Sequence, residues 1–198
     1  MRITALTIAA ALMATPAVVS AADQTPAARI GAYDDAVIAI MKQHLPMKAR
    51  VARFHLLVDD YYDMAAIAQI VAGPAWAKAP EVDRTALADA LAHHSAVQLA
   101  QNFARYGGER FIVDPAVQMR GDSAIVKVTI QSGGSPTILY YRLHQSGRGW
   151  TIIDVMSGGV SQLAVQRADL ASTASGSGGL GAVVRKLAAI DARTVASR

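Results

Sequence analysis

The sequence of 198 residues contains no cysteine. Disulfide bonds, thiolate metal ligands and cysteine nucleophiles are therefore excluded, and stability must come from packing alone. Hydrophobic residues make up 53% of the chain, which can supply that packing, whereas aromatic residues make up only 6%. So few aromatic side chains, without a dense run of Lys and Arg beside them, argue against a surface that binds nucleic acid.

The common catalytic and metal-binding motifs are absent as well. None of the five histidines has the spacing that puts two imidazoles on one helical face, as a zinc site requires. Ser161 lacks the second glycine of a nucleophile elbow. Gly176, Gly178 and Gly181 match G-x-G-x-x-G, but a dinucleotide site needs a strand before them, where periodicity indicates a helix. We interpret this segment as a linker between helices, and we expect neither an enzyme nor a cofactor.

The N-terminus has the pattern of an export signal. Arg2 supplies a positive charge, an apolar run extends over 3–14, and Val19-Ser20-Ala21 or Ser20-Ala21-Ala22 gives a small-x-small cleavage site. The apolar run is shorter than the roughly 20 residues that cross a bilayer. We predict a signal peptide at 1–22 and a single exported domain at 23–198, whose roughly 175 residues suffice for one core.

The remaining sequence divides into helices, a sheet and further helices. Apolar residues at three- and four-residue steps predict helices at 30–45, 48–60, 64–72 and 81–106. After Gly108 the period changes to two, which predicts an antiparallel arrangement of strands at 111–119, 123–131, 137–145 and 150–156. Helices are predicted again at 160–173 and 180–192. This order predicts an α+β fold, with helices packed on one face of a curved antiparallel sheet and an apolar pocket between them.

Two acidic positions stand out. Asp63 precedes an apolar helical run and is predicted to cap it. Asp154 lies on a predicted strand between Ile153 and Val155, where burial of a carboxylate is costly unless it is paired. A catalytic acid or base is one interpretation of Asp154; a structural carboxylate bonded to an Arg or to loop amides is the other. We favour the structural one, because no second catalytic group accompanies it.

Several short segments occur together in a characteristic order. They are Tyr62-Asp63-Met64, Gly73-Pro74-Ala75-Trp76, Tyr141-Arg142-Leu143, Gly149 to Val155, Gly159-Val160-Ser161, Arg167 and the helix from Gly178 to Leu187. In this order they resemble the MlaC family, also called toluene-tolerance auxiliary proteins, over nearly all of the exported part. Within that family, Tyr106 to Phe111 and Ile152 to Val155 resemble the hopanoid-associated HpnM subgroup.

The resemblance implies a periplasmic protein that carries a phospholipid or a hopanoid between the inner and outer membranes. Its implied partners are the lipid-binding subunit of an inner-membrane ABC transporter and an outer-membrane lipoprotein complex, and we expect a monomer whose only ligand is lipid. Exposure of an apolar lipid chain to water costs about 0.8 kcal/mol of free energy for each methylene group. A lipid carrier therefore needs an apolar cavity. Two segments depart from the family near the expected mouth, namely the polar His93-His94-Ser95 and the small Met156-Ser157-Gly158-Gly159.

We expect the cavity between the apolar face of the sheet and the helices at 48–72 and 81–106. The residues predicted to line it are Phe54, Met64, Ile67, Val71, Trp76, Leu91, Leu99, Phe103, Val126, Val128, Leu139, Tyr141 and Ile153. One alternative is that these side chains fill one another's space. The others are an envelope adaptor that binds a partner protein through an exposed apolar patch, and a small enzyme with Asp154 as base. The choice of lipid stays open, because acyl chains and a polycyclic hopanoid both need only apolar walls.

Overall fold

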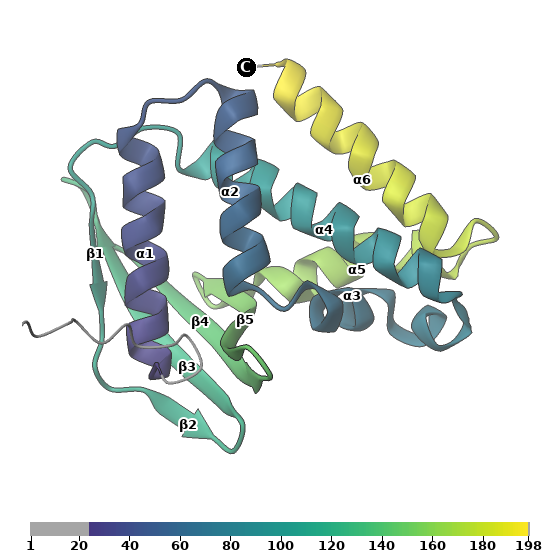
Figure 1. The fold of residues 1–198 in the computed structure, drawn as a ribbon, viewed down its shortest axis with the longest axis horizontal. Helices are drawn as coiled ribbons and strands as arrows, with labels where there is room; N and C mark the ends of the chain where they lie inside the picture. The colour runs from purple at the N-terminus through teal and green to yellow at the C-terminus, as the bar shows by residue number, and fades with distance from the viewer. Residues whose placement is uncertain (1–23, 198) are drawn as a thin grey trace, which may run out of the picture.

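In the part of the chain that the structure describes, helices come first and last along the sequence and a sheet lies between them (Figure 1). The computed structural model describes residues 24–197, and the predicted signal peptide lies outside them. The helices are α1 (Pro26–Lys42), α2 (Met47–Tyr61), α3 (Met64–Ala72), the 3-10 helix η2 (Gly73–Lys78), α4 (Glu81–Asn102), α5 (Gln162–Ser175) and α6 (Gly179–Ala196). The strands are β1 (Arg110–Val113), β2 (Gln118–Arg120), β3 (Ser123–Gln131), β4 (Thr137–Ser146), β5 (Gly149–Ser157) and β6 (Val160–Ser161).

The sheet is antiparallel and open. Its order is β1-β3-β4-β5-β6, and β2 also pairs with β3. The predicted meander of three long strands is confirmed as β3, β4 and β5. Alternation along β3 places Ala124, Val126 and Val128 on the inner face, where all three are fully buried, whereas Ile112 and Ile138 on the other face are each 41% exposed. Only one face of the sheet therefore belongs to the core, as the α+β prediction requires.

The helices cover this inner face in two groups. Figure 1 shows α1 lying across the sheet, where it packs on β1 and β3. The helix α4 packs against α2, α3 and α6, and α5 packs against α3, α6 and β5. Buried apolar side chains of both groups form one contiguous core with those of the sheet. No helix among residues 24–197 is long and apolar enough to cross a membrane.

The first helix ends at Lys42, earlier than the predicted Leu45. The chain leaves helical geometry at His44, whose φ is +49°. Because a residue that precedes proline is disfavoured in the helical region, Leu45 before Pro46 cannot extend the helix. The short connection that results turns the chain directly into α2.

The long helix ends at Asn102 and not at residue 106 as predicted. The Arg50 side chain of α2 meets this end, and its Nε donates a hydrogen bond to the carbonyl oxygen of Ala100 at 2.7 Å. The last carbonyl oxygens of a helix have no partner within the helix, and a guanidinium group that donates hydrogen bonds to them satisfies these acceptors. The helix can therefore stop here, and the Phe103 ring turns into the core.

The strand predicted at 111–119, with an interruption or bend at Pro115, is two strands separated at that proline. Both β1 and β2 pair with β3, and the break lies between them. Pro115 has no amide hydrogen to give to the ladder. The Asp114 carboxylate instead accepts a hydrogen bond from the Ala116 amide at 2.9 Å, which stabilises a turn.

Capping residues set the starts of two helices. The Asp63 carboxylate accepts the Ala66 amide at 3.0 Å, which confirms the predicted cap of α3. The helix predicted from Val160 begins at Gln162, because Val160 and Ser161 pair with β5 as a short strand. The Ser161 hydroxyl then caps the first turn of α5.

The glycine-rich segment joins α5 to α6, as the linker interpretation predicts. A helix precedes it, so it lacks the strand of a dinucleotide site. A Cβ atom at Gly178 would lie 2.7 Å from the Ala182 Cβ. Glycine is therefore required here by the tight start of α6.

Candidate functional site

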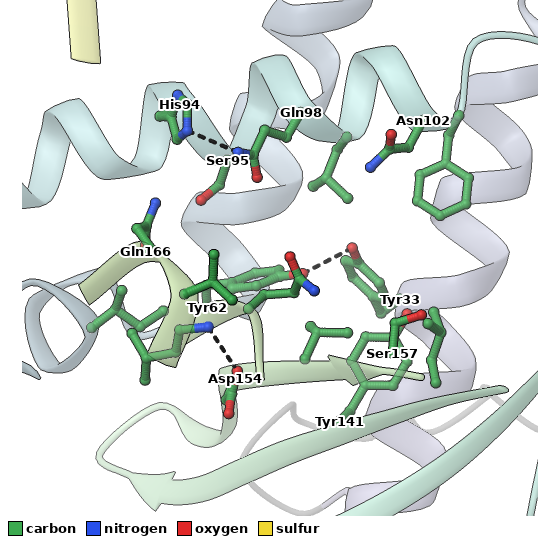
Figure 2. A pocket seen from close by; sticks show the side chains of 18 of the residues that line it. Tyr33, Tyr62, His94, Ser95, Gln98, Asn102, Tyr141, Asp154, Ser157 and Gln166 are labelled. Carbon is green, nitrogen blue, oxygen red and sulfur yellow. Dashed lines mark hydrogen bonds between the residues drawn. The ribbon is translucent and has the colours of Figure 1, made fainter. Parts of the chain in front are cut away.

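A cavity of about 920 Å³ lies between α4 and α6 on one side and β4, β5 and α5 on the other (Figure 2). This volume is in the range of small-molecule binding sites. Some of its lining residues, including Gln98, Asn102 and Thr137, are exposed. The cavity therefore has a buried floor and a rim that is open to solvent.

The floor of the cavity is apolar and comes from both layers of the fold. The sheet contributes half-buried Leu139, Ile153 and Val155. The helices contribute buried aliphatic side chains, namely Ile67, Leu163, Leu170 and Leu187. Such a surface suits hydrocarbon, since each buried methylene contributes about 0.8 kcal/mol.

Three buried tyrosines form part of this floor. The hydroxyl groups of Tyr33 and Tyr62 lie 3.1 Å apart and share a hydrogen bond, and the Tyr141 ring packs edge-on to Tyr33 at 5.8 Å between ring centroids. Burial raises the pKa of Tyr62 to about 12 and raises the pKa of the Tyr33 and Tyr141 hydroxyls well above their ordinary value. All three stay neutral at physiological pH, so the floor carries no tyrosinate charge.

The wall formed by α4 is polar, in contrast to the floor. His94, Ser95, Gln98 and Asn102 of α4 line the cavity, and all four are labelled in Figure 2. The expected apolar pocket is thus apolar only in its floor. The polar centre of this helix was visible in the sequence as a departure from the family, and it is the signal that could have found this wall.

His94 is held by hydrogen bonds at both ring nitrogens. Its Nδ1 lies 2.6 Å from the Asp191 carboxylate on α6, and its Nε2 lies 2.8 Å from the Gln98 amide nitrogen. This geometry makes Nδ1–H the donor to the carboxylate and Nε2 the acceptor of the amide hydrogen. Both ring nitrogens are therefore bonded within the protein, and the contact with Asp191 ties α4 to α6.

Asp154 has the structural role that we favoured from the sequence. The Ser161 hydroxyl donates to its carboxylate at 2.7 Å and the Leu163 amide at 3.1 Å, while the Arg142 guanidinium lies 3.7 Å away. The carboxylate touches the cavity, but its oxygens are committed to the start of α5 and to an arginine. It joins β5, β6 and α5 at one corner of the site.

The structure divides the predicted lining residues into two sets. Those that line the cavity are Ile67, Leu99, Phe103, Leu139, Tyr141 and Ile153. Those that do not are Phe54, Met64, Val71, Trp76, Leu91, Val126 and Val128. Most of the second set are buried against one another, as the solid-core alternative supposed, and Trp76 lies on η2 against Arg84.

For the two strand residues Val126 and Val128, the reason for this division is the position of α1. It covers β3, so the inward side chains Val126 and Val128 pack under a helix and are shut off from the cavity. Besides α4 and Ile67 of α3, the cavity is bordered by α1, α5 and α6, and the sequence-based prediction named none of these three helices. Their contribution includes Gln162, Gln166 and Lys186.

An open antiparallel sheet, helices on one face and a large cavity with an apolar floor define a ligand-binding α+β protein. The model of the MlaC protein family matches residues 32–189, and the chain belongs to this family, which confirms the resemblance seen in the sequence.

The fold also matches a solved structure. The phospholipid-binding protein from Ralstonia solanacearum, determined in complex with a phospholipid, superimposes with a TM-score of 0.68 at 23% sequence identity, covering 89% of this chain and 99% of that one. At this identity the likeness establishes a shared fold. Comparison with curated protein sequences gives no match.

Proposed function

We propose that this protein is a periplasmic lipid carrier, which holds one phospholipid or hopanoid in its cavity and moves it between inner- and outer-membrane components. The observation that carries the proposal is the cavity of about 920 Å³, whose floor is aliphatic and aromatic and whose rim is polar. Membership of the MlaC family and the phospholipid bound to a protein of the same fold support it.

The arrangement of the cavity fits the physical chemistry of a membrane lipid. Apolar chains gain about 0.8 kcal/mol for each methylene that leaves water, so they belong on the floor of Leu139, Ile153 and Val155. A polar head group keeps its hydration or finds hydrogen bonds at the rim. An open rim also allows the lipid to leave without unfolding of the carrier, as transfer between two partners requires.

The partners of such a carrier follow from the same proposal. We infer that it works as a monomer, auxiliary to an inner-membrane ABC transporter with a lipid-binding subunit, and that it exchanges lipid with an outer-membrane lipoprotein complex. The signal-like pattern at residues 1–22 supports the periplasmic location. The HpnM-like segments make a hopanoid a candidate ligand beside phospholipid.

Analysis of co-purified lipid tests the proposal. The full chain is expressed with its N-terminus intact, purified from the periplasmic fraction without detergent and extracted with organic solvent for mass spectrometry. We expect one lipid species or class at a ratio approaching one per protein. A protein that is folded and lipid-free, and that also fails to take up lipid from vesicles, would overturn the proposal and favour the envelope adaptor.

A further inference from the structure

Two pairs of carboxamide side chains border the open side of the cavity. Gln98 and Asn102 lie four residues apart on α4, and Gln162 and Gln166 lie four residues apart on α5. Residues at this spacing share one face of a helix. Each of the two helices therefore presents a polar strip to the same cavity, and Figure 2 shows Gln98 and Asn102 on α4 with Gln166 coming from α5.

These amides have hydrogen-bonding capacity to spare. In the part of the chain that the structure describes, Asn102, Gln162 and Gln166 make no side-chain hydrogen bond to protein, and Gln98 uses only its nitrogen, toward His94. Each carboxamide offers two donor hydrogens and an acceptor oxygen. A ligand group with hydroxyls, which both donate and accept, can use both halves of each amide.

The charges around the cavity do not suit an anionic head group. Its lining holds two cations, Arg105 and Lys186, against the three carboxylates Glu109, Asp154 and Asp169. The Lys186 ammonium already donates to the Asp169 carbonyl oxygen at 2.9 Å. Proteins that select phosphate converge Arg or Lys side chains on it, and this rim has carboxamides in that place.

We propose that the rim selects a lipid whose head group is uncharged and bears hydroxyls, such as a polyol or a sugar, over a lipid with an anionic phosphate head group. This inference rests on the proposed function, since it names the class of lipid carried. The apolar chains lie on the floor, and the hydroxyls bond to the two carboxamide strips. Selection comes from the amide hydrogen bonds together with the lack of excess positive charge.

A competition experiment with matched chains tests the selection. Lipid-free protein is incubated with equimolar dioleoyl phosphatidylglycerol and a dioleoylglycerol that carries one galactose, and the complexes are counted by native mass spectrometry. We expect the neutral glycolipid to be bound at least fivefold more than the anionic lipid. Equal binding, preference for phosphatidylglycerol or failure to bind either lipid overturns the selection. The carrier function is overturned as well only if the protein purified from the periplasm is also lipid-free.

Variants of the rim residues test whether the lipid preference comes from carboxamide hydrogen bonds or only from the space available at the rim. Asn102→Leu and Gln166→Leu should each reduce the preference for the glycolipid at least twofold, and Gln166→Lys should shift binding toward phosphatidylglycerol. Gln101→Leu is the matched control, because Gln101 neighbours Asn102 on α4 but does not line the cavity. If the rim variants keep the wild-type preference while folding normally, ordered water fills the rim and the proposal fails.

Discussion

A single buried residue near the tyrosine floor has unusual chemistry. Asp34 on α1 is 2% exposed, and neither of its carboxylate oxygens has a hydrogen-bond partner. Burial, and then the negative charge of Asp35, raise its pKa to about 8. Because the folded protein disfavours the charged form, Asp34 carries a proton at neutral pH. Asp34 is therefore a buried titratable group close to the neutral tyrosine hydroxyls of the cavity floor.

This residue should make stability fall as the pH rises. The unfolded chain loses the Asp34 proton near pH 4, whereas the folded chain keeps it until about pH 8. Between these values the unfolded state binds fewer protons, so the free energy of unfolding decreases with pH, by on the order of 5–6 kcal/mol in total. Asp34→Asn cannot ionise, and we expect it to lose this decrease.

Urea unfolding at a series of pH values from 4 to 9 measures the effect. Relative to wild type, Asp34→Asn should gain stability progressively toward pH 8 and then level off. Asp89→Asn, at an exposed position on α4, is the control and should parallel wild type. Parallel pH curves for wild type and Asp34→Asn would show that the folded protein does not hold this proton.

Between elements, the connection of β5, β6 and α5 depends on one carboxylate. The Asp154 side chain is 4% exposed and accepts both the Ser161 hydroxyl and the Leu163 amide. Asp154→Ala leaves a buried amide and a hydroxyl without their acceptor, beside the unpaired Arg142 charge. We expect a loss of about 2–4 kcal/mol in the free energy of unfolding.

Chemical denaturation measures this loss, with Asp122→Ala at an exposed turn as the control. The Asp154→Asn variant, which keeps one acceptor oxygen, should lose less stability than Asp154→Ala. Both variants should still take up lipid when folded, because the carboxylate positions a helix and performs no chemistry. Normal stability with abolished lipid uptake would show that Asp154 acts on the ligand directly.

Elements were predictable from sequence where local chemistry decides them. The alternation of β3 gives its bounds and its buried face, and Asp63 gives the start of α3. Boundaries were missed where a distant group decides them: Arg50 of α2 terminates α4, and pairing with β5 delays α5. Such long-range partners leave no periodic signal in the segment that they change.

The site was less predictable than the fold for a related reason. Alternation identifies the inner face of a sheet, but which part of that face is covered depends on where the helices lie. Val126 and Leu139 have the same inward pattern, yet α1 covers the first and the second borders the cavity. The family resemblance implied that a cavity exists, and only the three-dimensional arrangement separates its walls from the core.

At the scale of the whole molecule, the fold contains a close-packed core and, beside it, a cavity. Leu91 on α4 is fully buried and does not line the cavity. Leu91→Ala should therefore lower the free energy of unfolding by about 2–5 kcal/mol, as in other close-packed cores. Its lipid content after purification should remain close to wild type. Parallel loss of lipid from folded Leu91→Ala protein would mean that core and cavity are not separable.

The complementary substitution places a larger side chain in the cavity. Ile153 is half-buried on the cavity floor, so the larger ring of Ile153→Trp can occupy space that lipid would otherwise take. We expect this variant to keep wild-type stability when lipid-free, because it adds apolar contacts without displacing core side chains, and to bind at least fivefold less lipid from vesicles. Val160→Trp, at a position that is 51% exposed, adds the same ring outside the cavity and should bind normally. Undiminished lipid uptake by Ile153→Trp would place the bound chains elsewhere on the protein.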